Sequence, residues 1–475
     1  MTHTHAPEAV ETARSPRPWL ALIFLALAEF IVVLDASIVN IALPVLGTEL
    51  TMDNATLAWV ITAYVLPFGA LLLLGGRLAD RCGHRRLFLI GAAGFVIGSA
   101  LAGLSATAGM LLAARAVQGA SAALLAPAAL ALLTIIFPDP ADRGKALGIW
   151  GGVAGLGSGA GVLLGGLLTS SFGWESVFFI NVPIGLAAFV ATVLLIGRDT
   201  TAPAGRLDLA GAVTITGALV AMVAALSAAE RTGVFSLLPI VLAVVALMLA
   251  AAFVLVERRS PQPLVPLDIF GNRHLRSGNI VMLLLGAAMV GLFYALALFL
   301  GQVLEYSTLT IGLSQLPLAT ALILVAGIAP RLSGRLGAGK SLSMFSAILA
   351  GGLVWLAAAP ADAHFISHLL GPTVIIGIGI GGTFVIATQL AMHGVSGHET
   401  GLASGLVNTS QQIGGALGIA LLGAVASTRT ADLVAGGEDQ QQALAGGFSW
   451  LFAGAAAVAL IGAVVSLAAR TGKEA

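Results

Sequence analysis

Fourteen stretches of this sequence are apolar over roughly 20 residues each, and this feature limits the folds open to the chain. A helix needs about 20 apolar residues to cross the roughly 30 Å hydrocarbon core of a bilayer. In lipid the backbone must satisfy its own hydrogen bonds, so stretches of this length are expected to be α-helices. The stretches are residues 19–43, 57–76, 86–105, 109–136, 145–169, 174–196, 209–228, 236–256, 278–301, 309–330, 342–359, 366–390, 402–426 and 448–469.

The distribution of basic residues predicts the orientation of these spans. With the N-terminus placed inside, 19 of the 22 lysines and arginines fall in inner segments, and only Arg231 and Arg429 fall in outer ones. Arg115 lies within a span. Cytoplasmic loops of membrane proteins carry such an excess of positive charge. We therefore expect a multi-pass protein of the cell (plasma) membrane, with both termini in the cytoplasm.

The predicted domain organisation is an all-α polytopic membrane protein. A cytoplasmic tail (1–18) precedes a six-helix bundle (19–196), and an inter-bundle segment (197–277) adds two further membrane helices. A second six-helix bundle (278–469) and a short cytoplasmic tail (470–475) follow. The connections are too short for a soluble catalytic domain, and HExxH, CxxC and GxSxG motifs are absent. We therefore expect no enzyme activity, no catalytic residue and no metal site. The net charge of zero also gives no reason to expect a nucleic-acid partner.

Three charged residues lie well inside predicted spans, away from the span ends, where charge is costly and is by default a sign of function. Asp35 and Glu29 are in the first span, and Arg115 is in the fourth, with Gln118 on the same helical face. A buried carboxyl that balances desolvation against a nearby cation can load and release a proton. The alternative is a purely structural ion pair between helices.

The second and third spans are joined by a basic segment, residues 76–86, with the sequence GRLADRCGHRR. Its arginines set the orientation of the connection, and we interpret the segment as a conformational latch. The latch residues are Gly76, Asp80, Arg81, Gly83, Arg85 and Arg86. Asp80 is expected to engage the N-terminus of a facing helix that starts near Gly401.

Glycines line one face of the fifth span, at Gly157, Gly161, Gly165 and Gly166. Small residues let helices pack closely in lipid, and these glycines also fit a helix that bends during a conformational cycle.

Two motifs of soluble nucleotide-binding proteins occur by pattern alone. Residues 334–341 (GRLGAGKS) match the P-loop, and residues 377–382 (GIGIGG) match GxGxxG. The first fills a short inner connection with no room for a nucleotide-binding sheet, and the second lies within an apolar span. We interpret them as a basic membrane anchor and as a close helix contact.

Several of these segments together resemble the major facilitator superfamily, and more narrowly its fourteen-span drug:proton antiporter family. Residues 76–86 match the signature connection of the superfamily, and LDASIVNIALP around Asp35 and RAVQG at Arg115 match motifs of the first and fourth helices. Residues 178–185, 263–270 and 401–418 also resemble this family. The fifth-helix motif departs from it, since Val162 replaces the usual proline.

The resemblance implies two six-helix bundles plus a central helix pair, and transport by alternating access. It implies proton-driven efflux of a hydrophobic or cationic small molecule, with protons as the coupling ion and neither ATP nor another cofactor. Asp35, Arg115 and Glu29 are the predicted proton-coupling residues. The predicted substrate cavity is lined by Tyr64, Phe68, Gln118, Asn181, Tyr294, Asn408 and Gln411. Proton-coupled uptake on the same fold, an ATP-driven pump and a non-transporting membrane sensor are the alternatives.

Overall fold

The computed structural model describes residues 17–197, 208–232, 236–261, 263–393 and 400–468, and within its helices the side chain of Asp80 is among the few left out. All elements of these residues are helical. They are α1 (Pro18–Glu49), α2 (Asn54–Cys82), α3 (His84–Gly103), α4 (Ala108–Ile136), α5 (Pro140–Phe172), α6 (Ser176–Phe179), α7 (Asn181–Leu195), α8 (Leu209–Thr232), α9 (Leu237–Arg259), η1 (Leu267–Gly271), α10 (Arg273–Leu298), η2 (Phe299–Val303), α11 (Thr308–Leu336), α12 (Ala338–Ala357), η3 (Phe365–Leu369), α13 (Leu370–Met392), α14 (Thr400–Ala435) and α15 (Gln440–Ala468).

These helices account for all fourteen predicted spans. In the described part of the chain, thirteen candidate spans are long and apolar enough to cross a membrane, and the short α6 and α7 form one of them. The remaining helix, α5, is 33 residues long, and the apolar part of it that the structure describes is Gly159–Phe172. Most helices extend beyond their predicted spans because the polar residues that flank each apolar core continue the same helix. The chain is therefore a multi-pass membrane protein.

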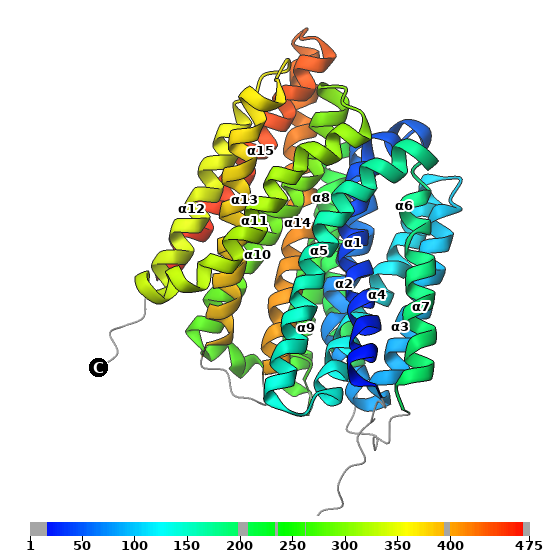
Figure 1. Cartoon of the computed structure of the whole chain (residues 1–475). Helices are drawn as coiled ribbons and strands as arrows, with labels where there is room; N and C mark the ends of the chain where they lie inside the picture. Colours follow the sequence, from blue (N-terminus) through cyan, green and yellow to red (C-terminus); the bar gives the residue numbers. More distant parts are fainter. Residues whose placement is uncertain (1–16, 198–207, 233–235, 262, 394–399, 469–475) are drawn as a thin grey trace, which may run out of the picture.

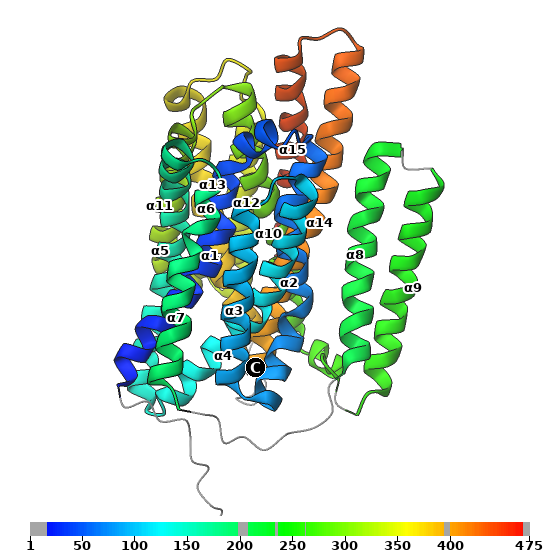
Figure 2. The ribbon, with the colours of Figure 1, turned by 90° about the vertical axis from the view of Figure 1, so that its right-hand side faces the viewer.

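The helices form two groups with a hairpin beside them. Helices α1 to α7 make one half and α10 to α15 the other (Figure 1). The halves meet where α2 packs against α14 and where α5 packs against α11. The additional hairpin, α8 and α9, stands to one side (Figure 2), and α8 contacts both α2 and α14. The hairpin therefore covers one of the two seams between the halves.

The connection between α2 and α3 is shorter than the sequence predicted. Residues 76–82 continue α2, residues 84–86 begin α3, and Gly83 alone separates the two helices. Gly83 has a φ of 96°, a conformation that a residue with a Cβ rarely adopts. The basic segment is therefore two helix ends joined by one glycine.

The two halves touch along α2 and α14, where a Cβ added to Gly405 would lie 2.9 Å from Leu73 Cδ2. They also touch at the end of the molecule where α1 ends and α2 begins, which we call the outer end. Near this end, a Cβ added to Gly166 of α5 would lie 2.8 Å from the carbonyl oxygen of Thr308 on α11. A Cβ added to Gly301 would lie 2.5 Å from the ring of Pro44. Gln302 also donates a 3.0 Å hydrogen bond to the side chain of Asn54. The outer end is therefore closed between the halves.

The opposite end, where α2 meets α3, is called the inner end. A separate group of buried apolar side chains lies there, and we call it the inner cluster. Its fully buried members are Ala212, Leu264, Val265, Leu275, Ala403 and Leu406. These residues come from α8, α10, α14 and the segment before η1, so the cluster joins the hairpin to the inner ends of the helices.

Candidate functional site

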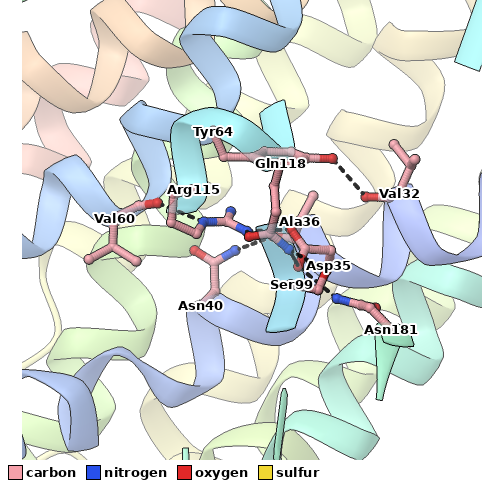
Figure 3. Close-up of polar contacts among 10 residues, drawn as sticks. All are labelled: Val32, Asp35, Ala36, Asn40, Val60, Tyr64, Ser99, Arg115, Gln118 and Asn181. Carbon is pink, nitrogen blue, oxygen red and sulfur yellow. Dashed lines mark hydrogen bonds and ion pairs between the residues drawn. The ribbon is translucent and has the colours of Figure 1, made fainter. Parts of the chain in front are cut away.

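Asp35 of α1 and Arg115 of α4 form an ion pair inside the first half (Figure 3). Both side chains are buried, with 0% and 1% of their surface exposed. Arg115 Nη1 donates to Asp35 Oδ2 and also, at 3.0 Å, to Gln118 Oε1. Its Nε donates to the backbone carbonyl of Val60 at 3.0 Å. The guanidinium is thus held by three acceptors from α1, α2 and α4.

The second oxygen of the Asp35 carboxyl is also occupied. Oδ1 accepts hydrogen bonds from Gln118 Nε2 at 3.1 Å and from Asn181 Nδ2 at 2.9 Å. Gln118 Nε2 in addition donates to the hydroxyl of Ser99 on α3 at 2.7 Å. Both carboxyl oxygens therefore accept from donors, as suits a carboxylate, and the group links α1 to α4 and α7.

Two aromatic rings enclose the guanidinium of Arg115. Its Cζ lies 4.3 Å from the centre of the Tyr64 ring and 5.8 Å from that of Phe178. A desolvated cation at these distances is stabilised by the electron-rich face of an aromatic ring. The Tyr64 hydroxyl donates to the carbonyl of Val32 at 3.3 Å, which fixes the ring against α1.

Close helix approach makes this network possible. A Cβ added to Gly119 would lie only 2.1 Å from the Tyr64 carbonyl oxygen, so α4 and α2 can meet there only at a glycine. A Cβ added to Gly98 would lie 2.8 Å from Cγ of Gln118. The two glycines thus let α4 reach α2 and α3 at the level of the ion pair.

The glycines of α5 lie where the sequence predicted a tightly packed face. Added Cβ atoms at Gly161 and Gly165 would lie 2.6 Å and 2.9 Å from the Cβ atoms of Ser37 and Ile41 on α1. Gly157 approaches Phe30 of α1 in the same way. The α5 glycines thus hold α5 against the helix that carries Asp35, while their role in bending stays a prediction.

Glu29 lies six residues before Asp35 on α1 and is half-buried. No hydrogen bond or ion pair joins it to the other described residues, so it stands apart from the Asp35–Arg115 network. Its role in proton coupling stays a prediction.

The predicted cavity residues fall into three groups. Tyr64, Gln118 and Asn181 belong to the Asp35–Arg115 network, and the half-buried Phe68 lies beside Tyr64 with ring centres 5.8 Å apart. Tyr294 is buried at the outer end, where its hydroxyl donates to the Asn54 carbonyl at 2.6 Å. It joins the two halves and also lines a small pocket beside α2, α8 and α14, and its place in a substrate cavity stays a prediction.

The remaining two cavity residues lie on α14. Asn408 is exposed, and its Nδ2 donates to the Ser404 carbonyl at 3.3 Å. Gln411 is half-buried, and its backbone oxygen lies 2.0 Å from where Gly286 of α10 would carry a Cβ. The place of both residues in a substrate cavity stays a prediction.

The latch residues lie at the inner end, where their helices meet other parts of the chain. Arg85 Nη2 donates to the Val193 carbonyl of α7 at 3.0 Å. Arg77, within the same basic segment, donates to the Pro263 carbonyl at 3.1 Å. Gly76, Arg81 and Arg86 lie on the helix ends beside Gly83. The expected contact of Asp80 with the helix starting near Gly401 lies outside the described side chains.

Sequence reasoning missed Ser99, Val60 and the ring of Phe178. Ser99 is a lone small hydroxyl in an apolar span, and Val60 contributes only a backbone carbonyl. Neither carries a signal that a single sequence reveals. Phe178 stands three residues before Asn181, and this spacing places both on one side of the α6–α7 segment.

Comparison with known proteins places these features in a wider context. A family model described as Major Facilitator Superfamily matches residues 25–419. The chain is 40% identical over 428 residues to a puromycin resistance protein from Streptomyces alboniger, covering 88% of this chain and 84% of the relative. It is 38% identical over 432 residues to a cephamycin export protein from Amycolatopsis lactamdurans, covering 90% and 88%.

Solved structures resemble the fold at low sequence identity. A bacterial homologue of the human lysosomal transporter Spinster, in an inward-facing and unoccupied conformation, superposes with a TM-score of 0.69 at 15% identity. The match covers 96% of this chain and 97% of that one. An auto-inhibited POT family peptide transporter gives the same TM-score at 16% identity and covers 96% and 98%.

Proposed function

This chain belongs to the major facilitator superfamily, and from that premise we propose that it exports a hydrophobic small molecule by proton-driven alternating access. The exported compound is a drug, an antibiotic or a secondary metabolite. Relatives named for puromycin resistance and cephamycin export, which align over most of both chains, support the direction of transport. A tetracenomycin C resistance and export protein from Streptomyces glaucescens, 34% identical, supports it further.

The observation that carries the proton coupling is the buried Asp35–Arg115 pair. A membrane-embedded carboxylate that holds one cation and two amide donors is expensive to bury and is a functional group by default. Its donors come from α4 and α7, so a relative movement of these helices changes how many donors it keeps. A change in donors changes how readily the carboxylate takes a proton.

The closed outer end supports a cycle in which substrate enters at the inner end. In our proposal a proton then reaches Asp35 from outside, Arg115 loses its carboxylate partner while it keeps Gln118 and Val60, and the substrate leaves. Return of the proton to the cytoplasm restores the ion pair. Moving one charge across 100 mV supplies about 2.3 kcal/mol, which sustains roughly a fifty-fold concentration ratio.

The test is efflux of a labelled antibiotic from proteoliposomes or from an efflux-deficient host, driven by an imposed pH gradient. Asp35→Asn should retain the fold and lose gradient-driven export. Glu438→Gln, an exposed carboxyl at the outer end, serves as the matched control and should export normally. Full proton-driven export by Asp35→Asn would overturn the assignment.

Uptake by symport is distinguished by direction. Cells that contain the protein should hold less labelled compound than cells without it. Accumulation that rises with the proton gradient would instead support a symporter. A non-transporting sensor predicts no flux in either assay.

An ATP-driven pump using residues 334–341 is disfavoured by local geometry. These residues end α11 and begin α12, with only Gly337 between the helices, whereas a P-loop follows a buried strand. Lys340→Ala should therefore keep its transport, and an uncoupler should abolish transport in both proteins. If Lys340→Ala lost transport and the wild-type protein kept transport in the presence of the uncoupler, the ATP-driven pump would be favoured.

A further inference from the structure

The segment of residues 263–270 (PLVPLDIF) lies at the inner end, where the hairpin meets both halves. Leu264 and Val265 are buried in the inner cluster. The cluster packs against Leu73 and Leu74 of α2 and against Leu402 of α14. One short segment therefore contacts the inner ends of helices from both halves, and we call it the strap.

Two polar contacts hold the strap in addition to its apolar side chains. Arg77 of α2 donates to the Pro263 carbonyl at 3.1 Å, and Glu257 of α9 accepts from the Val265 amide at 3.1 Å. The first contact belongs to the basic segment between α2 and α3, and the second belongs to the hairpin. The strap is thus fixed to both.

Glu257 faces a second buried carboxyl beneath the strap. Asp208 precedes α8, and its Oδ1 accepts from the Gly211 amide at 2.7 Å. A Cβ added to Gly211 would lie 2.6 Å from Glu257 Oε1 and 3.1 Å from Asp208 Oδ1, so both groups approach the first turn of α8. The two residues expose 8% and 4% of their surface.

Among the residues that the structure describes, each of these carboxyls keeps one oxygen without a donor. These oxygens are Asp208 Oδ2 and Glu257 Oε1, and both are buried. The described charged groups that act on Glu257 are Asp208 and Arg77. Arg77 forms no ion pair with Glu257, and its Nη2 donates to the Pro263 carbonyl instead. Two acceptor-only groups buried together, without a paired cation in the described part of the chain, are costly when both are ionised.

We propose that Asp208 and Glu257 together bind one exchangeable proton, and that this proton holds the strap docked across the inner ends of the two halves. The bound proton removes one of two like charges and turns one unpartnered oxygen into a donor. When the strap leaves, the O–H bond breaks and the proton passes to water at the inner end. Both carboxylates are then hydrated, and Arg77 is free of Pro263.

The sign of the pH dependence follows from this linkage. The docked strap binds the proton more tightly than the released strap, so rising pH favours release. A difference of one unit between the pKa of the pair in the docked state and its pKa in the released state changes the ratio of docked to released strap about tenfold. The proposal concerns the strap and a proton, and its test needs no transported substrate, so it stands or fails apart from the proposed export.

The experiment measures how fast a cysteine in the strap reacts with a maleimide in the purified full chain. The single native cysteine, the exposed Cys82, is replaced by serine, and Leu264→Cys is introduced as the buried reporter. Gly271→Cys, at an exposed position with open space around it, normalises for thiol ionisation. The normalised rate at Leu264→Cys should rise about tenfold as the pH is raised through the titration of the pair.

Two neutral variants identify the groups responsible. Glu257→Gln imitates the protonated acid, and Asp208→Asn does the same while keeping a good N-cap for α8. Both should label slowly at every pH. Asp439→Asn changes an exposed cap before α15 and should keep the wild-type profile. A flat wild-type profile, or an unchanged rise in Glu257→Gln and Asp208→Asn, would overturn the proposal.

Discussion

Asn181 donates a hydrogen bond to Asp35 at 2.9 Å, across 146 positions of the sequence. This contact joins the first residue of α7 to the middle of α1. The hydrogen bonding of the Asp35 carboxyl therefore depends on the position of a helix that is distant in the sequence. The Oδ1 atom of Asn181 is buried and has no hydrogen-bond partner among the described residues. Only the Nδ2 donor of the Asn181 amide therefore makes a hydrogen bond with the described residues, and its acceptor is Asp35.

Removal of this donor should weaken proton-driven export. A hydrogen bond to a charged group contributes about 2 kcal/mol, and Asn181→Ala removes the contact that joins α7 to Asp35. We expect Asn181→Ala to fold and to export more slowly than wild type under the same imposed pH gradient. Export rate in proteoliposomes measures the loss, and a rate identical to wild type would contradict it.

Arg115 should not tolerate replacement by lysine. The guanidinium bonds Asp35, Gln118 and the Val60 carbonyl at once and lies over the Tyr64 ring, and a single ammonium cannot reproduce this geometry. We expect Arg115→Lys to fold and to lose most export. Arg115→Ala leaves the buried carboxylate unpaired, at a cost of about 3–5 kcal/mol, and should also unfold at a lower temperature. Thermal unfolding of the purified variants separates the two effects.

Two glycines of α5 should respond differently to replacement by alanine. Gly161→Ala places a methyl group 2.6 Å from Cβ of Ser37, so α5 must shift away from α1. Gly159→Ala meets open space and should behave as wild type. We expect a lower thermal unfolding temperature and reduced export for Gly161→Ala alone. Equal behaviour of the two variants would show that the α1–α5 contact is not tight.

Tyr294 should stabilise closure of the outer end. Its hydroxyl donates to the Asn54 carbonyl of the other half at 2.6 Å, and such a bond contributes about 1 kcal/mol. Tyr294→Phe should therefore raise the population open at the outer end roughly fivefold. Spin-label distances between the outer ends of the halves measure this population. Tyr306→Phe, a half-buried tyrosine whose hydroxyl makes no bond to the other described residues, is the control.

The sequence by itself determined the class of the protein and the two charged residues at the centre of its site. Hydropathy is a local property, so each of the fourteen spans is readable from about 20 consecutive residues. The cost of charge in lipid likewise singled out Asp35 and Arg115, and the structure brings them together as a buried pair. The basic segment identified the superfamily, although its compact geometry around Gly83 depends on one backbone angle.

Only the tertiary structure decided which partners these residues have. Ser99, Asn181 and the Val60 carbonyl reach the ion pair because glycines let particular helices approach closely. The same holds for Tyr294, which closes the outer end, and for Asp208 and Glu257, which meet beneath the strap. Helix crossings place residues from distant spans at one point in space. No local pattern of residues encodes that meeting, because it depends on how all the helices pack at once.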